Sequence, residues 1–428
     1  MEPKNFGACA LAALAVLCMI GAGCTGFGQD KPATPGIPTP APGESAPAAV
    51  QAVADANNRF ACELYAQLAA DPRYAGGNLF FSPFSISSAL AITYEGARGE
   101  TAGEIRSVMH FPDDTATLRE GFLDINAGLT GDAGYTLHTA NALWAEKTHP
   151  FLPAYLATAK SWYGANTTNL DFITAPDESR RIINRWVEEQ TEDKITDLIP
   201  PDAIDRATRL VITNAVYFKG DWVLQFDRNN TREADFRTAS GAIVQVPMME
   251  RTDEEAVYGY AETDDLQLLS MPYEQGSGKK LSMVVLLPKS DGLSVIEGAL
   301  DAEQLAGLQA SATPRRVLAW LPKFTLETKY FLPETLSDMG MPGAFTAAAD
   351  FSGMDGTREL FITDVIHQAF IDVNEEGTEA AAATAVIMGK AAMPEPVPEF
   401  RADHPFVFVI QDDDTGAILF MGRVAAPA

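Results

Sequence analysis

From about residue 50 onward, apolar residues recur either every three to four positions or every second position, which are the periods of an amphipathic helix and of a strand. The clearest helical stretch carries Ile86 and Leu90 on one face and stops at Gly96. Ser82 and Pro83 precede it, and these residue types are typical of an N-cap and a first helical turn. We therefore predict a helix that begins at Pro83 and ends near Gly96.

Two further helices are expected from local patterns. Thr101 and Glu104 have the spacing of a capping box, so a helix is expected to begin there. Residues 184–198 carry an apolar face formed by Trp186, Val187 and Ile195, which predicts an amphipathic helix.

Strand-like runs dominate the second half of the chain, at 210–218, 283–287, 317–321 and 360–373. Two more runs, 406–410 and 417–421, flank the segment 412–416, whose Asp, Thr and Gly residues suit a short turn, so they predict a hairpin. Helical and strand patterns are mixed, and residues 50–428 contain neither a repeat nor a second linker. These features predict one α+β domain over 50–428.

The first 49 residues differ from the rest in composition. Residues 1–23 have Lys4 followed by an apolar run, which predicts a signal peptide, and the small residues before Cys24 resemble a lipobox. Cys24 is therefore the expected lipidation site, with an uncleaved membrane anchor and soluble secretion as alternatives. Residues 24–49 are rich in Pro and Ala, which is typical of an extended tether. The expected location is extracytoplasmic, on the outer face of the cell membrane.

Composition narrows the classes of partner. The chain of 428 residues is 46% hydrophobic, which is sufficient for a large core, and has a formal net charge of −27. That charge disfavours binding to nucleic acid, anionic headgroups or heparin-like polyanions. Removal of the signal would leave only Cys24 and Cys62, so no disulfide framework is expected, and Cys62 should behave as a small buried hydrophobe.

Enzyme motifs are missing from the sequence. There is no Gly-x-Ser-x-Gly, His-Glu-x-x-His or Cys-x-x-Cys, and none of the five histidines lies three or four residues from another. The segment 276–280 is similar to a phosphate loop, but Tyr273 stands where the first Gly belongs, so a hairpin loop between 268–273 and 281–287 is the better interpretation. We expect no catalytic residue, no metal site and no cofactor.

One segment combines a strand-compatible length with very small side chains. It consists of Glu375, Glu376, Gly377, Thr378, Glu379, Ala380, Ala381, Ala382, Ala383 and Thr384. Alternation puts the small residues 378, 380, 382 and 384 on one face and the only charge of 379–384, Glu379, on the other. The segment is therefore suited to entering a packed sheet, although Glu and Ala also favour a helix.

Six motifs in order resemble the serpin family over nearly the whole domain. They lie at 78–87, 141–144, 213–222, 246–249, 321–324 and, at the end of the chain, 403–406 with 419–424. Each motif alone is weak, but six in order around a small-residue hinge are specific.

The resemblance implies a serpin fold with three sheets, about eight to nine helices and an exposed reactive loop at 375–400. It also implies a suicide-substrate inhibitor of serine endopeptidases, whose cleaved loop inserts into the main sheet as a new strand. By motif match, the residues that control sheet opening, called the shutter, are Ser82, Ser85, Asn214 and His367, and Trp222 lies at the breach, where the loop first enters. The alternative is a non-inhibitory binding protein or chaperone on the same scaffold.

Two counts carried over from the family give the same scissile bond. Sixteen residues after Glu375 and nine residues before Phe400 both give Ala391, so the expected bond is Ala391-Ala392. A small Ala fits an elastase-like or subtilisin-like pocket. A loop shorter by one residue would instead present Lys390, with the bond before Ala391, to a trypsin-like protease. We expect a monomer whose partner is a serine protease.

Overall fold

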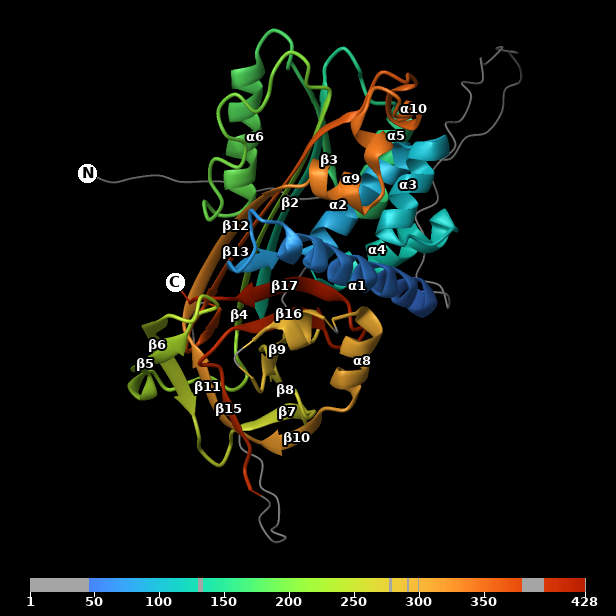
Figure 1. Ribbon diagram of the computed structural model, residues 1–428. Helices are drawn as coiled ribbons and strands as arrows, with labels where there is room; N and C mark the ends of the chain where they lie inside the picture. The colour runs from blue at the N-terminus through green and yellow to red at the C-terminus, as the bar shows by residue number, and fades with distance from the viewer. Residues whose placement is uncertain are drawn as a thin grey trace, which may run out of the picture. The chain divides into compact units, whose positions relative to one another are not determined.

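The computed structural model describes residues 46–129, 134–276, 279–290, 292–298, 300–378 and 396–427. These residues form ten α-helices and seventeen strands in three sheets (Figure 1). Two of the helices have only four residues, so eight longer ones remain. The predicted α+β fold is confirmed. Within this part of the chain, the helices are all too short or too polar to cross a bilayer.

The main sheet has six strands. Its order is β12 (Phe324–Phe331), β13 (Ile362–Val373), β4 (Leu210–Asp221), β2 (Tyr135–Glu146) and β3 (Asn166–Leu170), and the two-residue β14 (Gly377–Thr378) also pairs with β4. The predicted strands at 210–218 and 360–373 are thus neighbours, and motif 141–144 lies beside them.

The other two sheets complete the strand inventory. The seven-stranded sheet runs β1 (Leu79–Phe81), β17 (Ile418–Val424), β16 (Phe406–Asp412), β9 (Leu281–Pro288), β8 (Leu266–Pro272), β7 (Val257–Glu262), β10 (Thr313–Arg316). The four-stranded sheet runs β15 (Glu399–Arg401), β11 (Leu318–Pro322), β6 (Ile243–Arg251), β5 (Arg232–Arg237). Both predicted hairpins are confirmed, because β16 pairs antiparallel with β17 and β8 with β9.

The helices lie mainly outside the sheets. They are α1 (Ala46–Ala70), α2 (Pro83–Gly96), α3 (Gly99–Met109), α4 (Thr115–Leu129), α5 (Pro153–Tyr163), α6 (Pro176–Gln190), α7 (Ser294–Glu297), α8 (Ala302–Ala310), α9 (Pro333–Met339) and α10 (Ser352–Asp355), with two 3-10 turns at Arg228–Asn230 and Pro342–Phe345. Cys62 is a free, buried cysteine in α1, as expected.

Helix α2 begins and ends as predicted. Ser82 caps it by accepting a hydrogen bond from the Ser85 amide, and Pro83 occupies the first turn. The helix is buried on nearly all sides rather than on one, because it lies between the main sheet and the seven-stranded sheet.

The main sheet has two differently covered faces (Figure 1). Ile212, Val216 and Phe218 of β4 join the large core that includes α2, and we call this the inner face. Val211 and Ala215 join a smaller core with residues of α6, and we call this the outer face. Successive β4 residues thus alternate between the faces, as the pleat requires.

Two local predictions were wrong. Thr101 and Glu104 form no capping box, because Thr101 accepts a hydrogen bond from the Asp350 amide and Glu104 accepts one from the Gly343 amide. The expected helix 184–198 begins at Pro176 and ends at Gln190. The side chain of Asn184 binds both backbone groups of Ile199, so the chain after Gln190 folds back along α6 instead of extending it.

Candidate functional site

The parallel contact between β4 and β13 is the feature on which the site is built, and we call it the seam. Their paired residues run from Leu210 and Ile362 at one end to Tyr217 and Phe370 at the other. We call the first the lower end and the second the upper end, although the view in Figure 1 places the lower end toward the top. On either side the neighbouring contacts are antiparallel, β12 with β13 and β4 with β2. Parallel pairing is slightly less stable per residue, so the seam is the weaker contact in the centre of this sheet.

At the upper end the two strands diverge and β14 lies against β4. Gly377 pairs with Asp221 and Thr378 with Gly220, both antiparallel. Gly377 has a φ of 143° and a Cβ there would overlap the carbonyl oxygen of Gly220, so only glycine fits. The first hinge residues therefore already form part of the main sheet.

Glu375 anchors the start of the hinge. Its side chain is buried and accepts hydrogen bonds from Thr231 Oγ1 at 2.7 Å and Lys323 Nζ at 2.8 Å. Its carbonyl accepts one from the Phe226 amide at 2.8 Å. Burial alone would raise the pKa of Glu375, but the hydrogen bonds from Lys323 and Thr231 outweigh it and hold that pKa below its usual value. The charged form is thus favoured.

Trp222, the predicted breach residue, contacts the hinge directly. Its indole is buried, stacks on Tyr273 with ring centroids 4.5 Å apart, and donates a hydrogen bond to the Asn374 carbonyl at 3.0 Å. Its backbone amide donates to the Glu376 carbonyl at 2.9 Å. The Glu376 side chain forms an ion pair with Arg228. Residues that follow β4 therefore hold the hinge turn by two of its carbonyls and by one side chain.

The four predicted shutter residues form one hydrogen-bonded network on the inner face. Ser82 Oγ donates to the Leu419 carbonyl at 2.7 Å, and the Ser82 amide lies 3.0 Å from His367 Nε2. Asn214 Nδ2 donates to Ser85 Oγ at 2.7 Å, and Asn214 Oδ1 binds His367 Nδ1. Because His367 is on β13 and Asn214 on β4, this last bond crosses the seam.

The protonation of His367 follows from these contacts. Complete burial lowers the pKa of His367 to about 3, so the ring is neutral. Since Nε2 accepts from an amide, the proton is on Nδ1, which donates to Asn214. The ring also stacks on Tyr330 of β12, with centroids 6.3 Å apart.

Three residues of the site were not predicted. Asn141 Oδ1 accepts from both Ser85 Oγ at 2.9 Å and Asn214 Nδ2 at 2.6 Å, which extends the network to β2. Lys323 and Thr231 hold Glu375. Asn141 and Lys323 lie inside the family motifs 141–144 and 321–324, where a polar residue among apolar neighbours was the available signal. Thr231 gave none.

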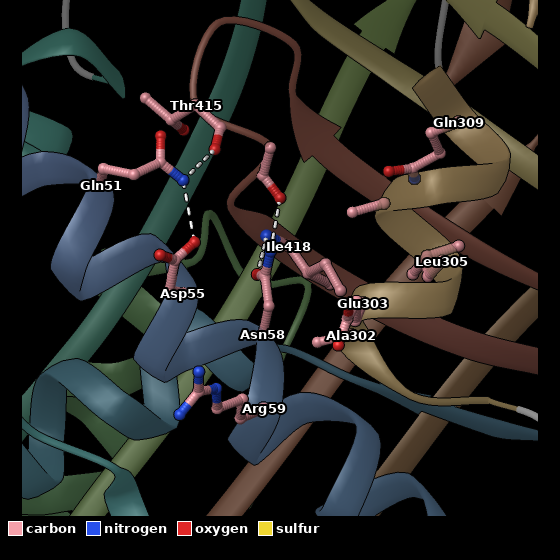
Figure 2. A pocket seen from close by; sticks show the side chains of 12 residues that line it. Gln51, Asp55, Asn58, Arg59, Ala302, Glu303, Leu305, Gln309, Thr415 and Ile418 are labelled. Carbon is pink, nitrogen blue, oxygen red and sulfur yellow. Dashed lines mark hydrogen bonds between the residues drawn. The ribbon is translucent and has the colours of Figure 1, made fainter. Parts of the chain in front are cut away.

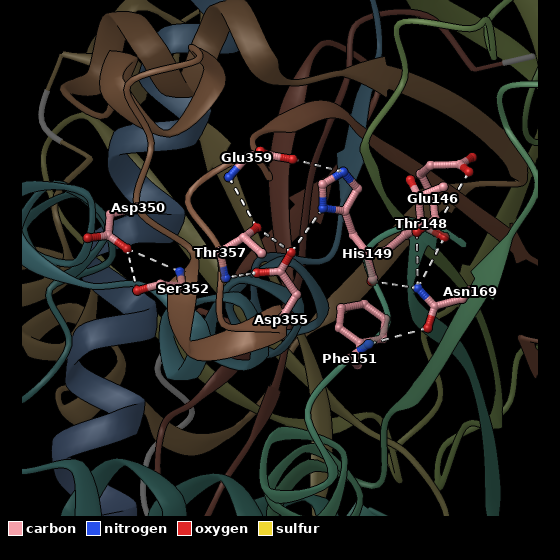
Figure 3. Close-up of polar contacts among 11 residues, drawn as sticks. Glu146, Thr148, His149, Phe151, Asn169, Asp350, Ser352, Asp355, Thr357 and Glu359 are labelled. Carbon is pink, nitrogen blue, oxygen red and sulfur yellow. Dashed lines mark hydrogen bonds and ion pairs between the residues drawn. The ribbon is translucent and has the colours of Figure 1, made fainter.

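The lower end of the main sheet has its own polar cluster (Figure 3). His149, which follows β2, lies with Nδ1 3.0 Å from Asp355 Oδ2, and Asp355 also accepts hydrogen bonds from Thr357. The Leu152 amide donates to the Met354 carbonyl at 2.7 Å. These contacts join the loop after β2 to the segment before β13, so they link the two sides of the seam from below.

The far end of the loop is anchored in the four-stranded sheet. Strand β15 pairs parallel with β11, and Phe400 is fully buried. The Arg401 guanidinium lies 3.8 Å from the centre of the Trp320 ring. The predicted bond at Ala391-Ala392, its alternative at Lys390, hinge residues 379–384 and Cys24 all lie outside the described residues.

A cleft of about 320 Å³ lies between α1, α8 and the turn that joins β16 to β17 (Figure 2). Asn58 donates to the Gly416 carbonyl at 2.7 Å and accepts from the Ile418 amide at 2.8 Å. Gln51 donates to Asp55 at 2.8 Å and to the Thr415 carbonyl of the turn at 3.4 Å. These polar groups already bind protein partners, and they attach α1 to the turn.

The site thus combines three sheets, a parallel seam and a hinge whose residues Gly377 and Thr378 pair with β4. The family model described as serpin, serine protease inhibitor, matches residues 55–427. The chain therefore belongs to the serpin family.

Relatives with similar sequences come from distant organisms. An uncharacterized serpin-like protein of Thermococcus kodakarensis is 43% identical over 379 residues, which cover 88% of this chain and 86% of the relative. The leukocyte elastase inhibitor of Bos taurus is 42% identical over 380 residues, covering 87% and 98%. The crystal structure of Serpin48 from Tenebrio molitor has a TM-score of 0.78 at 34% identity, covering 88% of this chain and 99% of that one. The family and these relatives support protease inhibition in general, rather than catalysis.

Proposed function

We propose that this protein inhibits serine endopeptidases as a suicide substrate, by inserting its cleaved reactive loop between β4 and β13. The observation that carries the proposal is the pairing of Gly377 and Thr378 with β4 at the upper end of the seam. A strand that has begun to pair antiparallel with β4 has only to continue along the same edge. Each further residue would replace part of one parallel contact by two antiparallel ones, which are slightly more stable per residue.

The register of β14 makes the proposed insertion specific. Thr378 is paired with Gly220, so a continued strand would bring Thr384 opposite Asn214 and Met388 opposite Leu210, the first residue of β4. Directly opposed residues of an antiparallel pair share a face. Residues 378, 380, 382 and 384 would then point to the inner face, and all of them are small.

Two pairings in that register favour the inserted state. When His367 moves away with β13, Asn214 Oδ1 loses its donor, and the hydroxyl of Thr384 would stand opposite it as a replacement. On the outer face Glu379 would lie opposite Lys219, and such cross-strand ion pairs contribute roughly 0.2–1 kcal/mol. The one charged residue of 379–384 would thus meet a cation rather than the core.

The chemistry of trapping needs the protease to supply the nucleophile. Its serine would attack the carbonyl of Ala391, form an ester there and release the new amino terminus at Ala392. Insertion would then carry the ester-linked protease along the main sheet and distort its oxyanion hole before water completes hydrolysis. An alanine at this position favours proteases with shallow, elastase-like or subtilisin-like pockets.

The test is incubation with elastase, subtilisin and trypsin, followed by a denaturing gel and sequencing of the released peptide. A covalent complex with a new N-terminus at Ala392 is expected. A terminus at Ala391, with trypsin as the faster target, would make Lys390 the bait. Cleavage without any covalent complex would favour the non-inhibitory binding protein instead.

A hinge variant separates insertion from recognition. Thr378→Arg would put a guanidinium on the inner face at the first buried position, which costs several kcal/mol and should slow insertion relative to deacylation. We expect the variant to be cleaved at the normal rate without trapping the protease. Glu379→Arg is the matched control, because its side chain would point outward. This variant should lose less of the protease-trapping activity than Thr378→Arg does.

We also propose that the inhibitor is tethered to the outer face of the membrane through lipidated Cys24. The motif and the Pro-rich segment 24–49 support this, since the latter could hold the domain several tens of Å from a surface at about 3.1 Å per residue. Cys24→Ser should move the protein from the membrane fraction to the medium. A mature N-terminus upstream of Cys24, found by mass spectrometry of the wild type, would contradict lipidation.

A further inference from the structure

Residues 191–197, which connect α6 towards β4, cross the outer face of the main sheet, and we call them the strap. The ammonium of Lys194 lies 5.4 Å from the ring centre of Tyr217 and 5.9 Å from that of Phe370. Both distances are within the range of a cation–π interaction. Tyr217 and Phe370 are the last paired residues at the upper end of the seam, so one cation contacts both strands at the end of the seam nearest β14.

The strap is attached on both sides of this point. Glu192 Oε1 lies 3.4 Å from Nε2 of His138 on β2, and the His138 ring stacks on Tyr217. On the other side, Lys329 of β12 donates a hydrogen bond to the Asp197 carbonyl at 2.8 Å. The strap therefore has contacts with β2, β4, β13 and β12.

The backbone of the strap is held in an unfavourable conformation. Glu192, Asp193 and Asp197 have φ values of 50°, 58° and 48°, in the left-handed region that residues other than glycine rarely adopt. The segment therefore keeps this shape through its anchors, which include Ile195, fully buried in the smaller core. Release of the anchors would be accompanied by relief of this strain.

From these contacts we infer that Lys194 is a positioning residue that sets the rate at which the seam opens. This inference rests on the proposed insertion and adds its regulation. A new strand would move β4 and β13 apart by about 4.8 Å, so the ammonium could no longer contact both rings. Lys194 thus stabilises the closed sheet selectively, and its removal lowers the barrier to insertion.

The test uses a synthetic peptide with the sequence of residues 378–389, added to the intact protein, so that no protease is needed. Lys194→Met should take up the peptide roughly three- to tenfold faster than the wild type, the range expected for one partly exposed cation–π contact. Lys194→Arg should keep the wild-type rate, because guanidinium makes the same contact. Lys289→Met, which removes an equal charge from an ion pair with Glu262 in the seven-stranded sheet, should also have no effect.

Hydrogen exchange provides a readout that does not depend on insertion. In Lys194→Met the amides of 211–217 and 365–370 should exchange faster, while those of β9 keep the wild-type rate. Phe370→Leu removes only the ring on β13, and it should also accelerate the exchange of these amides.

The outcomes separate the two hypotheses. If neither the wild type nor any variant takes up the peptide, the proposed insertion is contradicted. The hydrogen-exchange rates of the seam amides would then test the role of Lys194 by themselves. Wild-type exchange of the seam amides in Lys194→Met, or equal acceleration in β9, would overturn the inference.

Discussion

The two ends of the seam hold carboxylates in opposite ways. At the open upper end Glu375 is bound by Lys323 and Thr231, and these contacts keep its pKa below the usual value. At the closed lower end Asp364 follows a bulge in β13, and burial raises its pKa to about 6. The charged form is therefore favoured at the end of the seam next to β14 and disfavoured at the opposite end.

The shutter between these ends uses neutral groups. His367 stays uncharged because it is fully buried, and its bond to Asn214 crosses the seam. A neutral hydrogen bond can be exchanged for another during opening at a small net cost, whereas a buried ion pair cannot. In the proposed mechanism, the hinge anchor fixes where insertion starts and the shutter lets it proceed.

Cleavage of the loop should give the largest effect. If the closed lower end is only kinetically stable, nicking between 384 and 400 by a non-target protease should raise the midpoint of thermal unfolding by tens of degrees, or roughly ten kcal/mol or more. Calorimetry of intact and nicked protein measures this. For Thr378→Arg, nicking should raise the midpoint of thermal unfolding little or not at all. An unchanged midpoint in the nicked wild type would mean that the seam does not open beyond β14.

Acid should next destabilise the shutter. In the unfolded chain His367 becomes protonated at about pH 6.5, whereas in the folded protein it does so only near pH 3. The contribution of the neutral ring to the free energy of unfolding is therefore complete above pH 6.5 and falls by about 4–5 kcal/mol as the pH drops to 3. His367→Leu should cost about 2–4 kcal/mol at pH 7, because Asn214 loses its partner. The difference between variant and wild type should shrink at pH 4, as measured by urea unfolding. A difference independent of pH would refute the neutral, buried ring.

The contribution of Asp364 to stability should depend on pH in the opposite direction to that of His367. Its folded pKa of about 6 exceeds the usual 3.8, so it lowers stability as the pH rises through that interval, by about 2–3 kcal/mol in all. Asp364→Asn should therefore stabilise the protein at pH 7 and have little effect below pH 4. It should also steepen the acid loss, because Asp364 no longer offsets His367. Asp338→Asn, at an exposed site on α9, is the control for the charge change and should be nearly neutral.

The smallest effect is expected at the hinge anchor. Glu375→Gln should lower the free energy of unfolding by about 1–2 kcal/mol at pH 7, because the Lys323 ammonium would then donate to a neutral amide oxygen instead of a carboxylate. Since the folded pKa of Glu375 is depressed, this loss should be present above about pH 4.5 and disappear as the pH falls below it. Glu376→Gln is the matched control, because its partner Arg228 is exposed, and it should cost less. Equal costs for the two variants would contradict the anchor.

Local patterns were sufficient where neighbouring residues supply the partners. The N-cap of α2 at Ser82, the turn between β16 and β17, and the small alternate residues of the hinge are features of short segments, and the first two are confirmed. The order of the six motifs along the chain was likewise enough to predict the fold, because most of the motifs correspond to strands that follow one another in the sequence. Three of the four shutter positions lie inside these motifs, at Ser82, Ser85 and Asn214.

Contacts between distant residues could not be found in this way. The polar partners of Thr101 and Glu104 are some 240 residues away, so a local capping pattern gave a wrong helix start. The end of α6 depends on the bonds from Asn184 to Ile199, which exist only once the chain has turned back. Lys323 reaches Glu375, and Lys194 reaches Tyr217 and Phe370, across strands whose order in the sheet differs from their order in the chain. Residue types and spacing therefore led to the fold and the hinge, whereas the forces that keep the seam closed arise only when β4 and β13 are brought side by side.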